Sequence, residues 1–157
     1  MHELPRSVQA YFAFYRVRRY RETPWTPVSK PLPACRVALV TTTGVHLPSQ
    51  PPFDETIKGG DWSYREIPDS VDVQTLRISH KSYAFDQTGA QRDINLVLPL
   101  DRLREMRAEG RVGTLNGRHF SFMGSISAPG RLIAQTAPAV AQLLRDDGVD
   151  VVLLTPA

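Results

Sequence analysis

The sequence GVDVVLLTPA at residues 148–157 indicates the fold class of this chain. Residues 151–154 form an aliphatic run rich in β-branched side chains, which Thr155 and Pro156 close. A run of this length predicts a short strand buried on both faces of a parallel sheet. Residues 136–147, just before it, are expected to form a helix packed on that sheet. A helix followed directly by such a strand indicates an α/β protein.

A second, central strand is expected at residues 36–42, RVALVTT, because this run is apolar on both faces. Shorter strands are predicted at residues 71–80, 94–98 and 118–123, with a polar turn at 87–92. A helix is expected from Pro99 to Gly110, and residues 48–64 form a long irregular segment. We therefore predict a three-layer α/β domain over residues 34–157. Its sheet is mostly parallel with helices on both faces, Rossmann-like or flavodoxin-like, and the domain is incomplete or part of a split subunit.

Residues 1–33 are predicted to be a separate N-terminal segment. A helix opens at Pro5 and runs to about Arg21, and a strap with four prolines follows at residues 23–33, anchored by Trp25. Six of the nineteen basic residues lie between Arg6 and Lys30. We interpret this charge as a solvated face that contacts an acidic partner, in preference to nucleic-acid or membrane binding.

Composition places the chain in the class of single-domain globular proteins. It has 157 residues, of which 41% are hydrophobic, and a formal net charge of +3. One cysteine, Cys35, excludes an intramolecular disulfide and indicates a reducing compartment. No apolar run approaches the roughly 18 residues that span a bilayer, and no signal peptide is recognised. The predicted location is the cytoplasm.

Candidate functional residues follow the expected strands at their carboxyl ends, where open α/β sheets bind ligands. His46 follows the central strand, and His80 ends the next one. We predict catalytic acid–base roles for both, with a hydrogen-bonded structural histidine as the alternative. Thr42, Thr43 and Gly44 are predicted to contact the substrate.

A turn-rich stretch supplies a second group of candidates. Asp61, Ser63 and Arg65 have the chemistry to bind an anionic or zwitterionic group, and Arg65 is expected to pair a carboxylate with both arms. An ordinary capped surface loop is the alternative. Cys35 precedes its strand, so a small packed residue is favoured over a reactive thiol. The four histidines lack metal-ligand spacing, and no metal is expected.

Several stretches together resemble a known family in their order along the chain. They lie at residues 26–27, 30–32, 36–42, 44–47, 50–53, 60–68 (GDWSYREIP), 78–80, 93–95, 99–103, 122–124, 149–150 and 153–156. Between residues 24 and 157 the chain is similar to the B-type subunit (selenoprotein B) of the glycine, sarcosine, betaine and D-proline reductases. The resemblance identifies the chain as the N-terminal portion of such a subunit.

This resemblance implies reductive cleavage of a carbon–nitrogen bond in a small amino acid or related compound. It implies a Cys or selenocysteine redox centre after Ala157, a thioredoxin-like donor that reduces it again, and a pyruvoyl group on a partner subunit. No cofactor is expected within this chain. The expected partners are other reductase subunits or a missing C-terminal half. The sequence KSYA at residues 81–84 departs from the family, which has a second histidine or an aspartate beside the tyrosine. We expect Tyr83 to contact the substrate.

The resemblance also predicts the codons that come after Ala157 in the gene. We expect a UGA codon read as selenocysteine, then a cysteine and an amphipathic helix. The alternative is a two-gene split in which a neighbouring gene supplies that segment. The rival interpretation of the chain as a whole is a non-enzymatic binding or assembly subunit of a larger complex.

Overall fold

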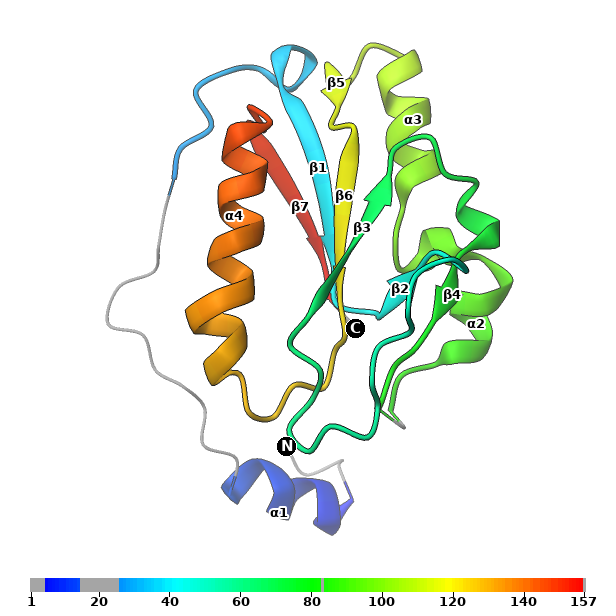
Figure 1. Cartoon of the computed structure of the whole chain (residues 1–157), viewed down its shortest axis with the longest axis vertical. Helices are drawn as coiled ribbons and strands as arrows, with labels where there is room; N and C mark the ends of the chain where they lie inside the picture. Colours follow the sequence, from blue (N-terminus) through cyan, green and yellow to red (C-terminus); the bar gives the residue numbers. More distant parts are fainter. Residues whose placement is uncertain (1–4, 15–25, 83, 157) are drawn as a thin grey trace.

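The computed structural model describes residues 5–14, 26–82 and 84–156 (Figure 1). The strands are β1 (Arg36–Thr41), β2 (Val45–His46), β3 (Tyr64–Pro68), β4 (Arg77–Ile78), β5 (Thr114–Leu115), β6 (Arg118–Phe122) and β7 (Val151–Thr155). The α-helices are α1 (Arg6–Phe14), α2 (Gln87–Arg92), α3 (Leu100–Ala108) and α4 (Ala137–Asp146). Short helical turns are η1 (Leu32–Ala34), η2 (Val73–Thr75), η3 (Ile94–Leu96) and the π-helical η4 (Leu132–Thr136).

The main sheet is built around β1. On one side β1 pairs with β7 in parallel, from Val37 opposite Val151 to Thr41 opposite Thr155. On its other side β5 and then β6 pair with β1, also in parallel. β3 pairs with β6 in antiparallel fashion and forms that edge of the sheet. The predicted mostly parallel sheet is therefore confirmed, and β2 and β4 form a separate antiparallel pair.

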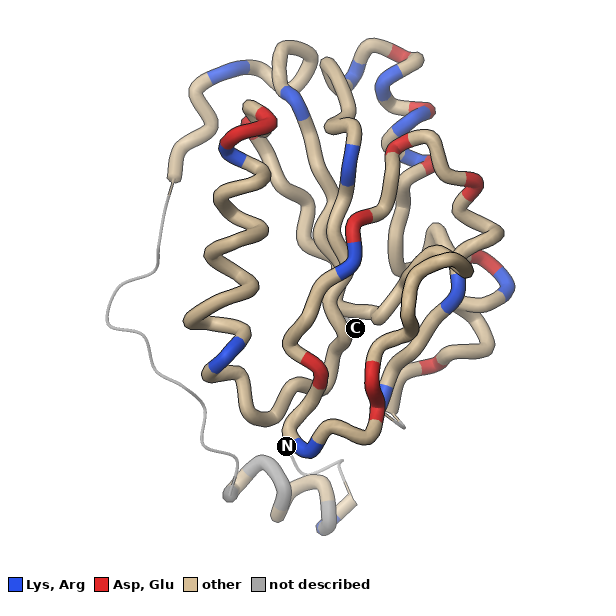
Figure 2. The backbone as a smooth tube through the Cα atoms, in the orientation of Figure 1, with Lys and Arg blue, Asp and Glu red and all other residues tan. Residues whose placement is uncertain are grey.

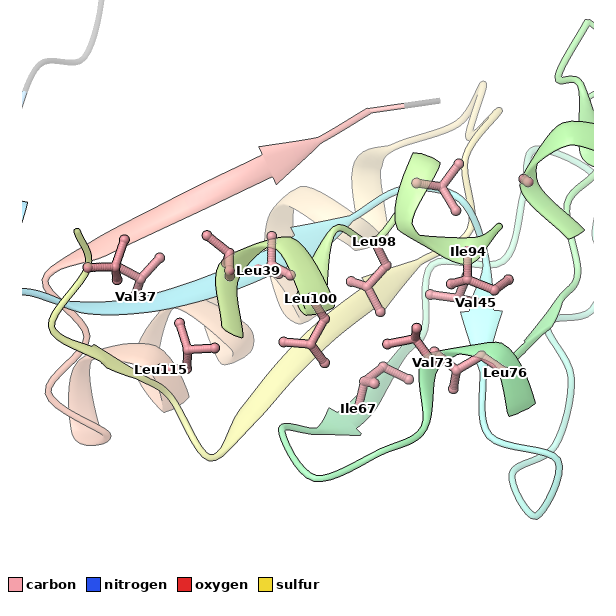
Figure 3. Packing of buried hydrophobic residues seen from close by; sticks show 14 of the residues in the cluster. Val37, Leu39, Val45, Ile67, Val73, Leu76, Ile94, Leu98, Leu100 and Leu115 are labelled. Atoms are coloured by element: carbon pink, nitrogen blue, oxygen red, sulfur yellow. The ribbon is translucent and has the colours of Figure 1, made fainter. Parts of the chain in front are cut away.

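Helices cover both faces of this sheet, as expected for three layers (Figure 1). Val37 and Leu39 of β1 belong to a core cluster that includes Leu100 and Leu103 of α3, and Figure 3 shows its close packing. Ala38 and its neighbour Val40 join the opposite cluster with Val140 and Leu144 of α4. Successive side chains of a strand point to opposite faces, so β1 is apolar throughout because it contributes to two cores.

Several predicted elements differ in the structure. β7 is present and parallel, but the prediction that it is buried on both faces is wrong, because it forms an edge and Leu154 is 67% exposed. The strand predicted at residues 71–80 is η2 followed by the two-residue β4, and the one at 94–98 is η3. The polar turn at 87–92 is helix α2, because the Asp86 carboxylate accepts from the backbone N–H groups of Thr88 and Gly89. β3 begins in the segment predicted to be irregular.

Of the predicted N-terminal segment, the structure describes residues 5–14 and 26–33. Helix α1 is described from Arg6 to Phe14. The predicted continuation of this helix to Arg21 and the predicted anchor Trp25 lie outside the described residues. In the described part of the strap, Lys30 Nζ lies 2.7 Å from the Asp150 carboxylate, just before β7. Asp150 also accepts from the backbone N–H of Arg36. None of the described helices is long and apolar enough to cross a membrane.

His119 supplies a hydrogen bond to β1 at the point where the strand partner of β1 changes from β5 to β6. The backbone N–H of Leu39 has no strand partner at this interruption and donates instead to Nδ1 of His119, at 3.1 Å. The other ring nitrogen, Nε2, lies 3.5 Å from the Asp69 carboxylate. Because Nδ1 accepts, the neutral ring carries its proton on Nε2 and donates it to Asp69. His119 is fully buried and therefore serves the sheet itself.

An ion pair fastens the start of β6 to the end of α4. Arg118 donates to both carboxylate oxygens of Asp147, at 2.8 and 2.9 Å, and also to Glu66. The hydrogen bond from Arg118 and a second one from Asn116 lower the pKa of Asp147 to about 2. We expect Asp147→Asn to lower the free energy of unfolding by about 1 kcal/mol at pH 7. Urea denaturation measures this loss.

The matched control is the more exposed pair of Arg111 and Glu109, 3.3 Å apart, where Glu109→Gln should cost less than about 0.5 kcal/mol. The stabilisation by Asp147 is complete above the pKa of about 3.8 of an unfolded aspartate and is lost as the pH falls toward about 2. An equal effect of both variants at pH 7 would contradict the assignment.

Candidate functional site

Three threonines meet at the carboxyl ends of β1 and β7. The hydroxyl groups of Thr41 and Thr155 both donate to the carbonyl oxygen of Val97, at 2.9 and 2.8 Å. The Thr43 hydroxyl lies 2.8 Å from that of Thr41, and both residues are fully buried. This network ties the strand ends to the chain that leads into α3. Of the predicted substrate contacts, Thr43 is thus placed inside the protein.

Gly44 turns the chain from the main sheet into the β2–β4 pair. Its φ angle is +70°, and its N–H donates to the carbonyl oxygen of Phe122 at 2.8 Å. Its own carbonyl accepts from Ser79 N at 3.0 Å. A Cβ atom at this position would lie 1.9 Å from the Ser79 carbonyl oxygen. The close contact between Gly44 and Ser79 is what brings His46 and His80 to the carboxyl edge of the sheet.

His46 is enclosed and hydrogen-bonded at both ring nitrogens. Nδ1 lies 2.9 Å from the Leu47 carbonyl oxygen, which can only accept, so Nδ1 carries the proton. Nε2 therefore accepts from the Ser79 hydroxyl, at 3.1 Å. The ring also makes an edge contact with Phe53 and is 4% exposed. This arrangement is that of a hydrogen-bonded structural histidine, and the predicted catalytic role stays a prediction.

His80 is equally buried, but one of its ring nitrogens has no partner among the described residues. Nδ1 accepts from the backbone N–H of Ser82 at 3.1 Å, so the neutral ring carries its proton on Nε2. Within the described part of the chain, Nε2 has no hydrogen-bond partner. Burial lowers the pKa of His80, although the nearby Glu55 opposes this effect. At neutral pH the side chain is therefore uncharged, and its N–H has no acceptor within the described ranges.

A glycine beside His80 makes room for this ring. A Cβ atom on Gly124 would lie 2.3 Å from Nε2 of His80 and 2.6 Å from the carbonyl oxygen of Thr42. The next residue, Ser125, is the one described residue other than glycine with a positive φ, at 57°. Such backbone conformations are sparsely populated and gather at functional sites. The sequence of this loop carried no signal for it.

A cavity of about 980 Å³ opens next to His80 at this edge of the sheet. Its lining includes Glu55, Lys81, Phe85 and Ser125 as well as His80. His46 does not line it, so of the two predicted histidines only His80 faces this cavity. Phe85 packs against His80 with ring centroids 4.6 Å apart. Tyr83, a predicted substrate contact, lies outside the described residues.

Ser63 and Arg65 form a separate cluster that does not line this cavity. Burial opposes the ionisation of Asp61, but hydrogen bonds from Ser63 and Asp54 outweigh it and lower the pKa of Asp61. Arg65 donates to Ser63 Oγ and to the carbonyl oxygens of three residues, Pro51, Pro52 and Tyr64. Its guanidinium also lies 4.3 Å from the ring centroid of Phe53. The cluster thus holds residues 51–54 against β3.

Cys35 lies at the other end of the sheet. Its side chain is buried at the start of β1, with Sγ 3.5 Å from the Pro31 carbonyl oxygen and 3.6 Å from that of Lys30. His80 and the cavity are at the carboxyl ends of the strands, whereas Cys35 is at the amino end of β1. The packed position agrees with the interpretation of Cys35 as a small structural residue.

The fold and this site define a class: an α/β protein with a cavity at the carboxyl edge of a mostly parallel sheet, the usual place for small-molecule sites. Residues 8–157 match the glycine/sarcosine/betaine reductase selenoprotein B family, and the chain belongs to this family. The predicted resemblance is confirmed.

Three relatives illustrate the match. The chain is 37% identical to D-proline reductase subunit gamma of Acetoanaerobium sticklandii over 131 residues, which are 83% of this chain and 52% of that protein. It is 32% identical to glycine reductase complex component B subunit gamma of Carboxydothermus hydrogenoformans, over 87% of this chain and 31% of the relative. It is 26% identical to betaine reductase complex component B subunit beta of Peptoclostridium acidaminophilum, over 80% of this chain and 29% of the relative. The chain thus spans about half the length of these relatives or less. No solved structure matches.

Proposed function

We propose that this chain is part of a thiol- or selenol-dependent reductase complex, and that the cavity beside His80 receives a small amino acid or related compound. Membership of the reductase family supports the first part. The second part rests on one observation: His80, whose buried N–H has no partner among the described residues, lines a cavity large enough for such a substrate. The proposed partners are the other subunits of the complex.

The proposed reaction is the reductive cleavage of a carbon–nitrogen bond. Two thiol-type groups supply two electrons and two protons: the carbon–nitrogen bond breaks, a carbon–hydrogen and a nitrogen–hydrogen bond form, and the thiols become a disulfide-type bond. A thioredoxin-like donor would reduce that bond again. We place this centre outside the described residues, since Cys35 is buried at the opposite end of β1. A pyruvoyl group on a partner subunit remains part of the proposal.

His80 has the properties of a hydrogen-bond donor in such a reaction. Its neutral ring carries a buried N–H that no described group accepts, and burial keeps the ring uncharged at neutral pH. A neutral N–H in a site shielded from water can donate to the negative charge that develops on a substrate oxygen. Phe85 and Gly124 hold the ring in place from two sides.

The test is His80→Phe in the assembled reductase complex, because glutamine would supply an amide N–H in place of Nε2–H. We expect kcat/KM to fall at least about 100-fold, because removing a donor to a developing negative charge has effects of that size. Arg77→Gln, an exposed position on β4, is the control and should stay within about twofold. Circular dichroism checks that both variants fold. Full activity of a folded His80→Phe complex would remove His80 from the reaction and favour the assembly-subunit interpretation.

A further inference from the structure

Strand β7 leaves an apolar surface at one edge of the sheet. Val152, Leu153 and Leu154 are 36%, 41% and 67% exposed. β7 pairs with β1 on one side, and no described strand pairs with its other side. Its backbone N–H and C=O groups on that side therefore form an open hydrogen-bonding edge, which is a template for another strand.

The opposite edge of the same sheet is protected and β7 is not. β3 carries Arg65, Glu66 and Pro68, and charges and prolines are the usual means by which an edge strand avoids pairing. Residues 151–155 contain no charged side chain and no proline. Figure 2 shows this contrast: β3 carries red and blue segments, whereas β7 is tan along its length. An aliphatic edge without such protection is expected to be covered.

In the described part of the chain, side chains of β7 are exposed on both faces of the sheet as well as at its edge. Residues paired in register share a face, so Val152 and Leu154 lie on the α4 side with Ala38 and Val40. Leu153 lies on the α3 side with Leu39. On that side Leu96 is 69% exposed, next to Val97, whose carbonyl oxygen binds Thr155. A covering element must therefore supply a strand at the edge and apolar groups on two faces.

We propose that β7 is an internal strand in the working protein, covered by a further parallel strand with a helix on each face. The occupant that we infer is the part of the family polypeptide that this chain does not match. Nearly half of D-proline reductase subunit gamma is of this kind, since the chain covers 52% of it. The strands that pair with β1 are all parallel to it, and parallel strands are joined through helices, which would cover the two faces. This inference rests on the family and not on the reaction.

The test is to co-express this chain with the unmatched part of the Acetoanaerobium sticklandii subunit. We expect a one-to-one complex by light scattering and, at residues 151–155, amide hydrogen exchange at least about tenfold slower than in the chain alone. Leu154→Lys should weaken the complex at least about tenfold, because it places a charge in the covered surface. Val28→Lys is the matched control, at an aliphatic residue 55% exposed elsewhere, and should leave binding unchanged.

The contrary results are specific. Failure of the two polypeptides to co-purify, or a complex that Leu154→Lys leaves unchanged, would overturn the proposal. A dimer of this chain alone with protected amides at residues 151–155 would show that a second copy is the occupant, and would overturn it too. Because no substrate is present, these outcomes are independent of the reductase assay.

Discussion

Gly44→Ala should lower the free energy of unfolding by about 3 kcal/mol or more, and Gly110→Ala by only about 1 kcal/mol. Both glycines have a φ of +70°, so both substitutions introduce the same backbone strain. Only at Gly44 does the new Cβ meet another group, the Ser79 carbonyl oxygen at 1.9 Å, whereas nothing lies within 4 Å at Gly110. The difference between the two variants therefore measures the close approach of residues 44 and 79.

Urea denaturation at pH 7 checks this expectation. Because Ser79 precedes His80 directly, Gly44→Ala should also displace the His80 ring and disturb the cavity. The chemical shift of the His80 imidazole is then expected to change in Gly44→Ala and to stay unchanged in Gly110→Ala. Equal stability losses in the two variants would mean that the contact with Ser79 relaxes freely and does not position the site.

His119→Ala should cost about 3 kcal/mol, the second largest effect that we expect from a single substitution. It removes a buried ring and leaves the Leu39 N–H without an acceptor in the middle of the sheet. His119→Gln retains a side-chain acceptor and should cost less. Denaturant unfolding of the two variants separates the lost hydrogen bond from the lost volume. A similar, small loss in both would contradict the role of His119 in the ladder.

The pH dependence of stability provides a further check on His119. Burial lowers its pKa below the usual 6.5, against the opposing effect of Asp69. The unfolded chain therefore takes up this proton more readily, so stability is fully present above pH 6.5 and declines as the pH falls below it. His80 contributes with the same sign, because burial lowers its pKa as well. His119→Gln and His80→Gln should each make the decline of the unfolding free energy with falling pH less steep. An unchanged slope in both variants would contradict the conclusion that both rings are buried in the neutral form.

These predictions separate the support of the site from its chemistry. Gly44 and His119 act on the framework: one holds the β2–β4 pair against the sheet, and the other closes the gap between β5 and β6. His80 and the cavity concern the proposed reaction, and Leu154 concerns the proposed covering segment. A loss of activity in Gly44→Ala would therefore say little about the role of the His80 N–H, whereas a folded but inactive His80→Phe complex would support that role directly.

The amino-acid sequence by itself determined the class of fold and the family. The aliphatic runs at residues 36–42 and 151–154 identify parallel strands because their apolar character does not alternate. The order of motifs between residues 24 and 157 carried the family resemblance. Sequence also placed His46 and His80 at the ends of expected strands, since residues that follow such runs lie at the carboxyl edge.

Only the tertiary structure decided which neighbours each of these residues meets. The run at 151–154 looks the same whether one strand or two lie beside it, so the exposure of β7 was not predictable from its composition. His46 and His80 occupy similar places along the chain, yet Ser79 and Leu47 satisfy both nitrogens of His46, while Nε2 of His80 lies beside Gly124 without a described partner. Hydrogen-bond partners and strand neighbours depend on segments distant in sequence, and a local pattern does not record them.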